Sequence, residues 1–183
     1  MSRISRAFNI KKMVITALLI AVGVILPMAF HVIPYGLAGR ALLPMHIPVL
    51  LVGLICGAPF GLIAGIVTPL LSHAITGMPP SAFLPAMTVE LAAYGAASGL
   101  LMRFAPPKNL YIKIYVALIG AMLFGRIIYG TVNALIFSAG EYSMQMWLTA
   151  AFVTALPGII IQLMAIPSIV VALQRERLIK VRE

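Results

Sequence analysis

Charged residues are scarce in this chain of 183 residues: they make up 9% of it, and only four of them are acidic. Soluble domains are usually about 25% charged. Apolar residues make up 62% of the chain, so too few polar side chains remain to cover a surface in water. The same composition excludes intrinsic disorder, because disordered chains are poor in apolar residues. The composition therefore predicts an integral membrane protein.

Cysteine is almost absent as well, since Cys56 is the only one. A single cysteine excludes a disulfide framework within the chain and a metal site built from several cysteines. The sequence also lacks a phosphate-binding glycine-rich loop with its lysine, an HExxH motif and a GxSxG motif. These absences argue against an enzyme, and any ATP hydrolysis that drives the protein must come from a partner.

Long apolar runs fill most of the chain. A helix needs about 20 residues to cross a bilayer, so we predict an all-α membrane protein of six transmembrane helices in one domain, residues 1–183. The predicted spans are 12–30, 42–57, 59–75, 83–103, 112–138 and 146–173. Gly57 and Pro59 favour a tight hairpin between the second and third spans, because proline disfavours the helical conformation in the residue before it. One long helix through this point is the alternative.

Most basic residues fall into three clusters. They are Arg3, Arg6, Lys11 and Lys12 at the N-terminus, Arg103, Lys108 and Lys113 around the 104–113 connection, and Arg175, Arg177, Lys180 and Arg182 in the tail. Cytoplasmic loops carry the excess of Lys and Arg. Six crossings put all three clusters on one side and five do not, which predicts cytoplasmic N- and C-termini in the cell membrane. Orientation, with some attraction to anionic lipid, accounts for these charges without a nucleic-acid partner.

The connections 31–41, 76–82 and 139–145 then face outward, and two charges lie inside the spans: Glu90 in the fourth and Arg126 in the fifth. Charges at such depth are costly and mark a functional hypothesis. At 1.5 Å per residue, both lie about a third of the way in from the outer side of a core about 30 Å thick. We therefore expect them to pair, either as a structural lock between the two helices or in contact with a substrate, and one role does not exclude the other.

Polar side chains surround this predicted pair. Arg126, Tyr129 and Asn133 share one helical face, and Glu90 shares another with Tyr94. The sixth span has a semi-polar stripe of Trp147, Ala151, Thr154, Gly158 and Gln162. Three such faces are predicted to converge on a cavity that opens outward and suits a small ligand. Alternatively, Asn133 bonds only a neighbouring helix and Trp147 is only an interfacial anchor.

Two further polar residues join the candidate substrate site from the outer side. His46 begins the second span, and Arg40 in the preceding loop can attract an anion. A metal site needs histidines clustered with carboxylates. Because His31, His46 and His73 are scattered along the sequence, we predict no metal site.

Two features carry a resemblance to a known family. Ala17 and Ala21 lie four residues apart on the first span, a spacing that lets helices approach closely in lipid. The second feature is the run PMHIPVLLVG…TPLLSHAITGMPP between residues 44 and 80. With its size and six spans, the chain resembles the substrate-binding S components of energy-coupling factor (ECF) vitamin transporters over nearly its whole length. The run is similar to that of one subgroup, most like the pantothenate-specific S components.

The resemblance implies a binding protein with no enzymatic activity and no cofactor of its own. Its partners would be a transmembrane coupling subunit, which docks on Ala17 and Ala21, and two cytoplasmic ATPase subunits. Substrate would be captured on the outer side and carried inward as the S component topples. S components for nickel and cobalt carry a histidine at position two, where this chain has Ser2, and this difference disfavours metal uptake.

Pantothenate is the leading candidate substrate, because its carboxylate can meet Arg126 and its hydroxyl and amide groups suit Asn133, Tyr129 and Glu90. A pyridoxine-like compound, a thiamin precursor or cobalamin is the alternative for the same pocket. Two other classes of protein stay open. One is a secondary carrier driven by protons through Glu90, although no internal repeat of the kind such carriers use is visible. The other is a membrane scaffold that transports nothing.

Overall fold

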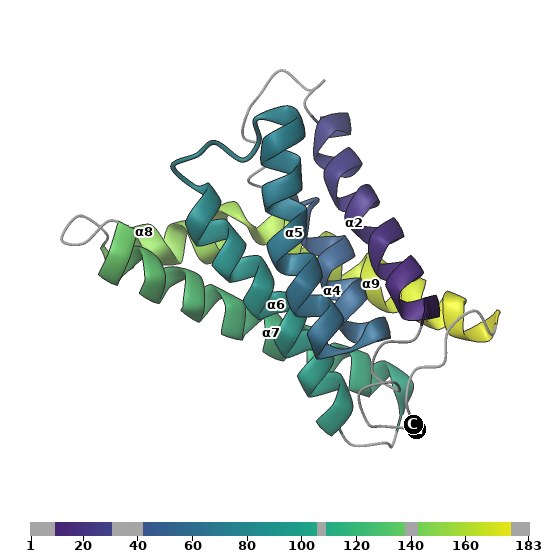
Figure 1. Cartoon of the computed structure of the whole chain (residues 1–183). Helices are drawn as coiled ribbons and strands as arrows, with labels where there is room; N and C mark the ends of the chain where they lie inside the picture. The colour runs from purple at the N-terminus through teal and green to yellow at the C-terminus, as the bar shows by residue number, and fades with distance from the viewer. Residues whose placement is uncertain (1–9, 31–41, 106–108, 138–142, 177–183) are drawn as a thin grey trace.

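The structure, a computed structural model, describes residues 10–30, 42–105, 109–137 and 143–176, and all the regular elements in these ranges are helices (Figure 1). They are α2 (Ile10–Phe30), α4 (His46–Cys56), α5 (Ala58–Thr76), α6 (Leu84–Phe104), α7 (Leu110–Val132), the π-helical η1 (Asn133–Phe137), α8 (Met144–Leu148), the π-helical η2 (Thr149–Thr154) and α9 (Leu156–Arg175). The predicted all-α fold class is confirmed for the described residues.

Five helical stretches are long and apolar enough to cross a membrane: Ile10–Met28, Ala58–Thr76, Leu84–Phe104, Leu110–Leu135 and Leu156–Arg175. The remaining apolar helix, α4, has 11 residues. At 1.5 Å per residue it is about 16 Å long, which is short of a bilayer core of about 30 Å. Five of the six predicted spans thus have a counterpart of spanning length, while the sixth crossing and the cytoplasmic position of both termini stay predictions.

The second predicted span, 42–57, is shorter than expected because its first residues do not join the helix. Leu43 has a φ of +50°, in the left-handed region that a right-handed helix excludes. The helix therefore begins at His46, whose N–H donates to the carbonyl of Leu43 at 3.0 Å. Pro48 lies in the first turn, where a missing N–H leaves no gap in the helical hydrogen bonds. This late start places the His46 side chain at the N-terminal end of α4, where it is 2% exposed.

The break between α4 and α5 is the tight hairpin that the sequence favours, and not one long helix. Gly57 separates the two helices with a φ of +100°, which side chains rarely adopt. The helices fold back on each other closely enough that a Cβ on Gly61 would lie 2.9 Å from the Cα of Gly53. The turn therefore needs glycine both at the reversal and along the contact that follows it.

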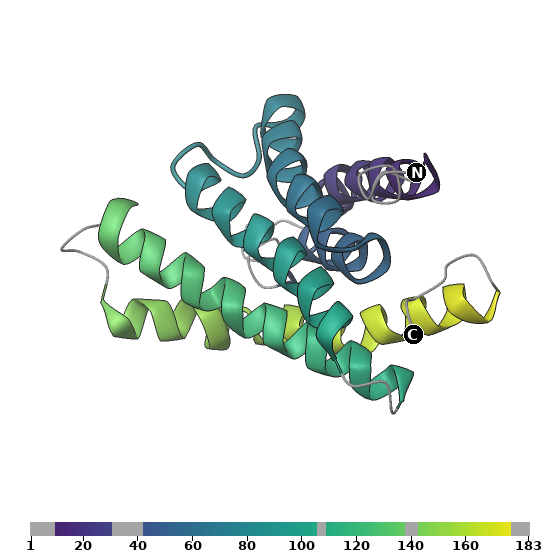
Figure 2. The same cartoon turned by 60° about the horizontal axis from the view of Figure 1, so that its bottom comes forward.

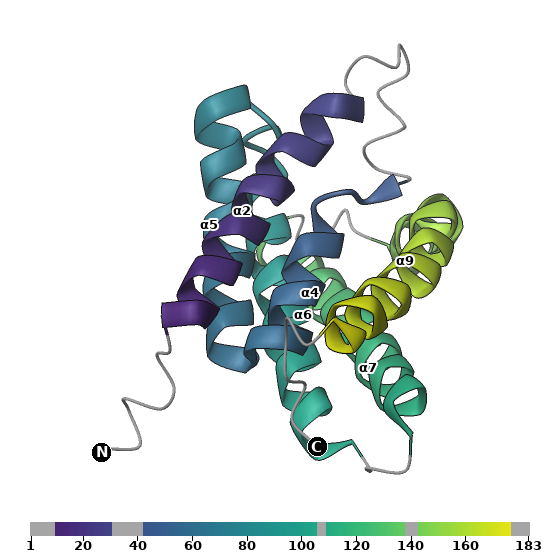
Figure 3. The same cartoon turned by 90° about the vertical axis from the view of Figure 1, so that its right-hand side faces the viewer.

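Short α4 lies at the centre of the molecule and packs against α2, α5, α6, α7 and α9. Figure 3 shows α2 and α5 on one flank of it and α7 and α9 on the other. Nine of its 11 residues are buried. The main core cluster joins Leu50 of α4 to Leu91 of α6, Leu118 of α7 and Ile166 of α9. A candidate site beside α4 is therefore shielded from both flanks.

The sixth predicted span, 146–173, is one apolar run in the sequence but three elements in the structure. The chain passes from α8 through η2 to a break at Ala155, after which α9 begins with Pro157 in its first turn. The preceding helix α7 also ends in a π-helical segment, η1. Figure 2 shows α7 and the α8–α9 segment together on one side of the α4–α6 group. Such π segments are rare and frequently occur at functional sites.

Candidate functional site

Glu90 of α6 and Arg126 of α7 form a buried ion pair. The Arg126 Nη1 donates to Glu90 Oε1 at 2.9 Å, and the two side chains are 9% and 4% exposed. The expected pairing of these two residues is confirmed. Taking two charges out of water costs on the order of several kcal/mol per ion. Stabilisation of the fold is therefore a weak explanation for burying this pair.

His46 lies on the other side of the Glu90 carboxylate. Its Nε2 is 3.9 Å from Glu90 Oε2, which is too far for a hydrogen bond. The Tyr94 ring, one helical turn after Glu90, meets the His46 ring edge-on with centroids 5.2 Å apart. Tyr94 is 1% exposed and packs on Gly125, where a Cβ would lie 2.9 Å from the tyrosine ring. Four predicted site residues from three helices therefore form one contact cluster: His46, Glu90, Tyr94 and Arg126.

Trp147 connects the α8 segment to this cluster. Its indole Nε1 donates to the backbone carbonyl of Arg126 at 2.9 Å. The indole lies against Gly130, where a Cβ would collide with it. It also meets the Phe152 ring edge-on, with centroids 5.7 Å apart. Trp147 is thus bonded to the backbone of Arg126, one of the two paired residues.

The remaining predicted site residues are Tyr129, Asn133 and Arg40. Asn133 donates from Nδ2 to the Tyr129 carbonyl at 2.8 Å, a bond within its own helical segment and not to a neighbouring helix. Asn133 is buried and Tyr129 is half-buried. Arg40 lies outside the described residues, so its expected place near the site stays a prediction.

Several buried nitrogen atoms on α4, α7 and α9 have no hydrogen-bond partner among the described residues. They are Arg126 Nη2, both ring nitrogens of His46, and Gln162 Nε2 of α9. Buried polar side chains usually have a partner. The three residues come from α7, α4 and α9, which pack together around the main core cluster. The cluster can therefore donate hydrogen bonds to a small molecule that is rich in oxygen acceptors.

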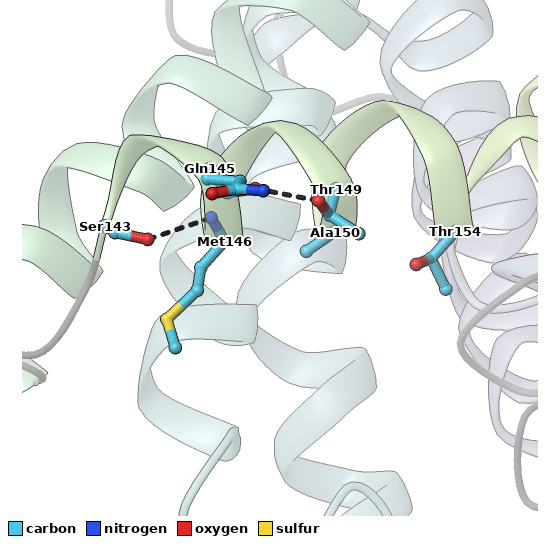
Figure 4. A pocket seen from close by; sticks show the side chains of 6 residues that line it. All are labelled: Ser143, Gln145, Met146, Thr149, Ala150 and Thr154. Atoms are coloured by element: carbon cyan, nitrogen blue, oxygen red, sulfur yellow. Dashed lines mark hydrogen bonds between the residues drawn. The ribbon is translucent and has the colours of Figure 1, made fainter.

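A groove of about 480 Å³ lies nearby but does not contain the ion pair. It runs along α8 and η2 and is lined by Ser143, Gln145, Met146, Thr149, Ala150 and Thr154 (Figure 4). Two of its polar groups are already hydrogen-bonded to the backbone nearby: Ser143 Oγ accepts from the Met146 N–H, and Thr149 Oγ1 donates to the Gln145 carbonyl. Glu90 and Arg126 are both buried and do not line this groove. The arrangement is that of a closed site beside an open surface groove.

The part of the chain that the structure describes contains no group of three or more His, Cys, Asp or Glu residues placed to hold a metal ion. His46 and Glu90 are close together, but two such ligands are fewer than a zinc site uses.

A family model described as "ECF transporter, substrate-specific component" matches residues 11–170. The matched range contains all the helices that contribute to the ion-pair cluster. In the comparisons with curated proteins and with solved structures, nothing matches the chain.

Proposed function

The chain belongs to the family of substrate-specific components of ECF transporters, and from this premise we propose which substrate it takes and where it binds it. Membership supports a substrate-binding membrane subunit that associates with an ECF module. We propose that it captures a small water-soluble vitamin, pantothenate first, from the outer side of the cell membrane. The module would comprise a transmembrane coupling subunit and two ATPase subunits, and the chain itself would need no cofactor.

The observation that carries this proposal is the spare donor on Arg126. Glu90 occupies Nη1, while the buried Nη2 has no partner among the described residues. A guanidinium presents a planar fork of N–H groups that suits carboxylates. A ligand carboxylate on Nη2 would satisfy the orphaned donor and leave the bond to Glu90 intact.

The chemistry of the cluster favours pantothenate among the candidate vitamins. Its single carboxylate suits Arg126. Its hydroxyl and amide groups offer hydrogen-bond partners for the ring nitrogens of His46, which have none among the described residues. Tyr129 of α7 and Asn133 of η1 are further candidate partners for these groups. A pyridoxine-like compound, a thiamin precursor or cobalamin would bring no comparable carboxylate to Nη2. These remain alternative substrates for the same site.

Access to the site requires movement, because the ion pair is closed off. The adjoining segment α8 has no buried residue, and the Trp147 indole bond to the Arg126 carbonyl connects it to α7. We propose that α8 and η2 move outward to admit the ligand. Since Trp147 is the only tryptophan in the chain, its fluorescence would report this event.

Docking on the coupling subunit is proposed for the outward face of α2. Ala17 and Ala21 are exposed there, whereas Thr16, Gly23 and Val24 face the bundle and are buried. Two small residues four apart let a partner helix approach closely.

The test is a titration of Trp147 fluorescence in detergent-purified protein with pantothenate, pyridoxine, thiamin and cobalamin. We expect a saturable change with pantothenate that Arg126→Ala abolishes. The matched control is Arg103→Ala, at the exposed end of α6, which should bind as the wild type does. Normal binding by Arg126→Ala would return Arg126 to a structural role.

Two further outcomes would favour the other classes of protein. If none of the four compounds changes the fluorescence or gives a binding signal in calorimetry, the result would favour a membrane scaffold that transports nothing. Uptake into cells that survives loss of the ATPases but stops when the proton gradient is removed would favour the secondary carrier.

A further inference from the structure

Gln162 in the middle of α9 has a buried amide nitrogen that no group in the described residues satisfies. The side chain is 1% exposed, and its Nε2 has no hydrogen-bond partner among the described residues. A buried donor without a partner destabilises the folded state. By contrast, Ser168 on the same helix donates to the Met164 carbonyl and needs no further partner. The unpartnered amide nitrogen of Gln162 is therefore expected to lower the stability of the fold unless a ligand binds to it.

The Gln162 side chain lies on the inward face of α9. Gly158 and Ile166, one turn before and one turn after it, are both buried. Ile166 belongs to the core cluster that contains Leu50 of α4 and Tyr94 of α6. Ile161 and Met164, on other faces of the same turn, are exposed. Gln162 thus faces the helices that carry His46 and Arg126, and not the lipid.

The unpartnered nitrogens of Arg126, His46 and Gln162 come from three helices that pack against one another. Arg126 suits a carboxylate. A neutral carboxamide N–H is satisfied equally well by a neutral carbonyl or hydroxyl oxygen. The Arg126 and Gln162 donors therefore suit two different groups of one ligand, a carboxylate and a neutral oxygen.

We infer that Gln162 is a ligand-binding residue whose amide donates to a carbonyl or hydroxyl oxygen of the ligand, while Arg126 holds the ligand's carboxylate. The ligand class is a small monocarboxylate with a second oxygen acceptor remote from the carboxylate. The inference rests on the proposed function, because it assumes that a ligand occupies the ion-pair cluster. It adds α9 to the ligand site and explains why a costly amide is buried there.

The test uses Gln162→Met, which removes the amide with little change in length and volume, with pantothenate as the probe. In the ligand-free protein the melting temperature should rise, since an unpartnered donor has been replaced by an apolar group. The affinity for pantothenate should fall about tenfold, as expected for one lost hydrogen bond. The ligand-induced rise in melting temperature should shrink accordingly. Gln162→Glu, which presents an acceptor and a negative charge, should lose binding altogether.

Gln174→Met is the matched control on the same helix. It lies 12 residues further along, roughly 18 Å away at the helical rise, and its buried Oε1 also has no hydrogen-bond partner among the described residues. We expect it to raise the melting temperature without changing the affinity. The pair of variants therefore separates the cost of an orphaned amide from its use in binding.

Each contrary result has one meaning. If the wild type binds pantothenate and Gln162→Met binds it equally well, the inference is overturned and the proposed function stands. If Gln162→Met and Gln162→Leu both melt lower or fail to fold, the amide serves the ligand-free fold, for example through a bound water, and the inference is again overturned. If the wild type binds none of the four vitamins, the proposed function fails and takes the inference with it.

Discussion

The α4–α5–α6 group and the α7–α9 side of the molecule are packed in opposite ways. In the first, glycines bring backbones together: a Cβ on Gly61 would collide with the backbone of Gly95, and one on Gly65 with that of Leu91. In the second, glycines make room for rings, as Gly125 does for Tyr94 and Gly130 for Trp147. Backbone contacts between small residues hold helices closely in lipid, whereas ring contacts leave side chains that can repack.

Helix α6 belongs to both regions and carries the site between them. Its Gly95 lies in the backbone contact with α5, while the adjacent Tyr94 and the preceding Glu90 face His46 and Arg126. Glu90 is therefore held by the tightly packed group, and Arg126 by the side that contains both π segments and the exposed α8. From this difference we expect ligand binding to reshape the α7–α9 side against a fixed α4–α6 group.

The largest expected effect comes from breaking the pair that joins the two regions. Arg126→Met leaves the Glu90 carboxylate buried and unpaired, which should cost about 3–5 kcal/mol of stability. The double variant with Glu90→Leu should recover most of that loss, because an apolar pair is often as stable as a buried ion pair. Neither variant should bind pantothenate. Thermal unfolding and calorimetry in detergent measure the two quantities, and a double variant that still binds would make the ion pair purely structural.

The second effect tests the tight packing of the α4–α6 group. Gly61→Ala places a Cβ against the Gly95 backbone, which cannot rotate away, and we expect a loss of about 2–3 kcal/mol. In the control Gly120→Ala the added Cβ meets only the end of the Leu101 side chain, which can turn aside, so the loss should stay below about 1 kcal/mol. Thermal unfolding compares the two. Equal losses would mean that the two regions do not differ in rigidity.

The sequence predicted the features that follow from helix geometry and from the local conformational preferences of glycine and proline. The depth of Glu90 and Arg126 follows from the rise per residue and their distance from the span ends, and this placed them at one level. The reversal at Gly57 follows from local glycine and proline chemistry. Both features depend on a few neighbouring residues, which is why they are visible without a structure.

Features that depend on tertiary packing were not predictable. Pro157 marks the start of α9, but the π-helical register of η2 before it leaves no mark on an apolar run. The Trp147 bond to the Arg126 carbonyl joins α8 to α7. It depends on how these two helices pack, which the sequence alone does not reveal. Gln162 stands in the predicted polar stripe of the sixth span, but only its burial without a partner distinguishes it from a residue that faces lipid headgroups.

A smaller effect is expected from loosening the α7–α9 side. Trp147→Phe keeps a ring beside Gly130 but removes the indole N–H that donates to Arg126. One lost hydrogen bond should cost about 1 kcal/mol of stability, and pantothenate affinity, measured by calorimetry, should change less than about tenfold. A complete loss of binding, as for Arg126→Met, would instead place the indole in direct contact with the ligand.

The smallest effect on the isolated chain is expected at Ala17 and Ala21, which touch neither region's interior. Both are exposed on α2, so replacing them with leucine should change stability by no more than about 0.5 kcal/mol and leave pantothenate binding unchanged. Association with the coupling subunit and transport should nevertheless be lost, because leucine prevents the close approach that small residues allow. Ala74→Leu, equally exposed on α5, is the control that should still assemble. Co-purification with the ECF module and vesicle uptake measure the difference, and a variant that assembles but no longer binds pantothenate would remove the docking role from α2.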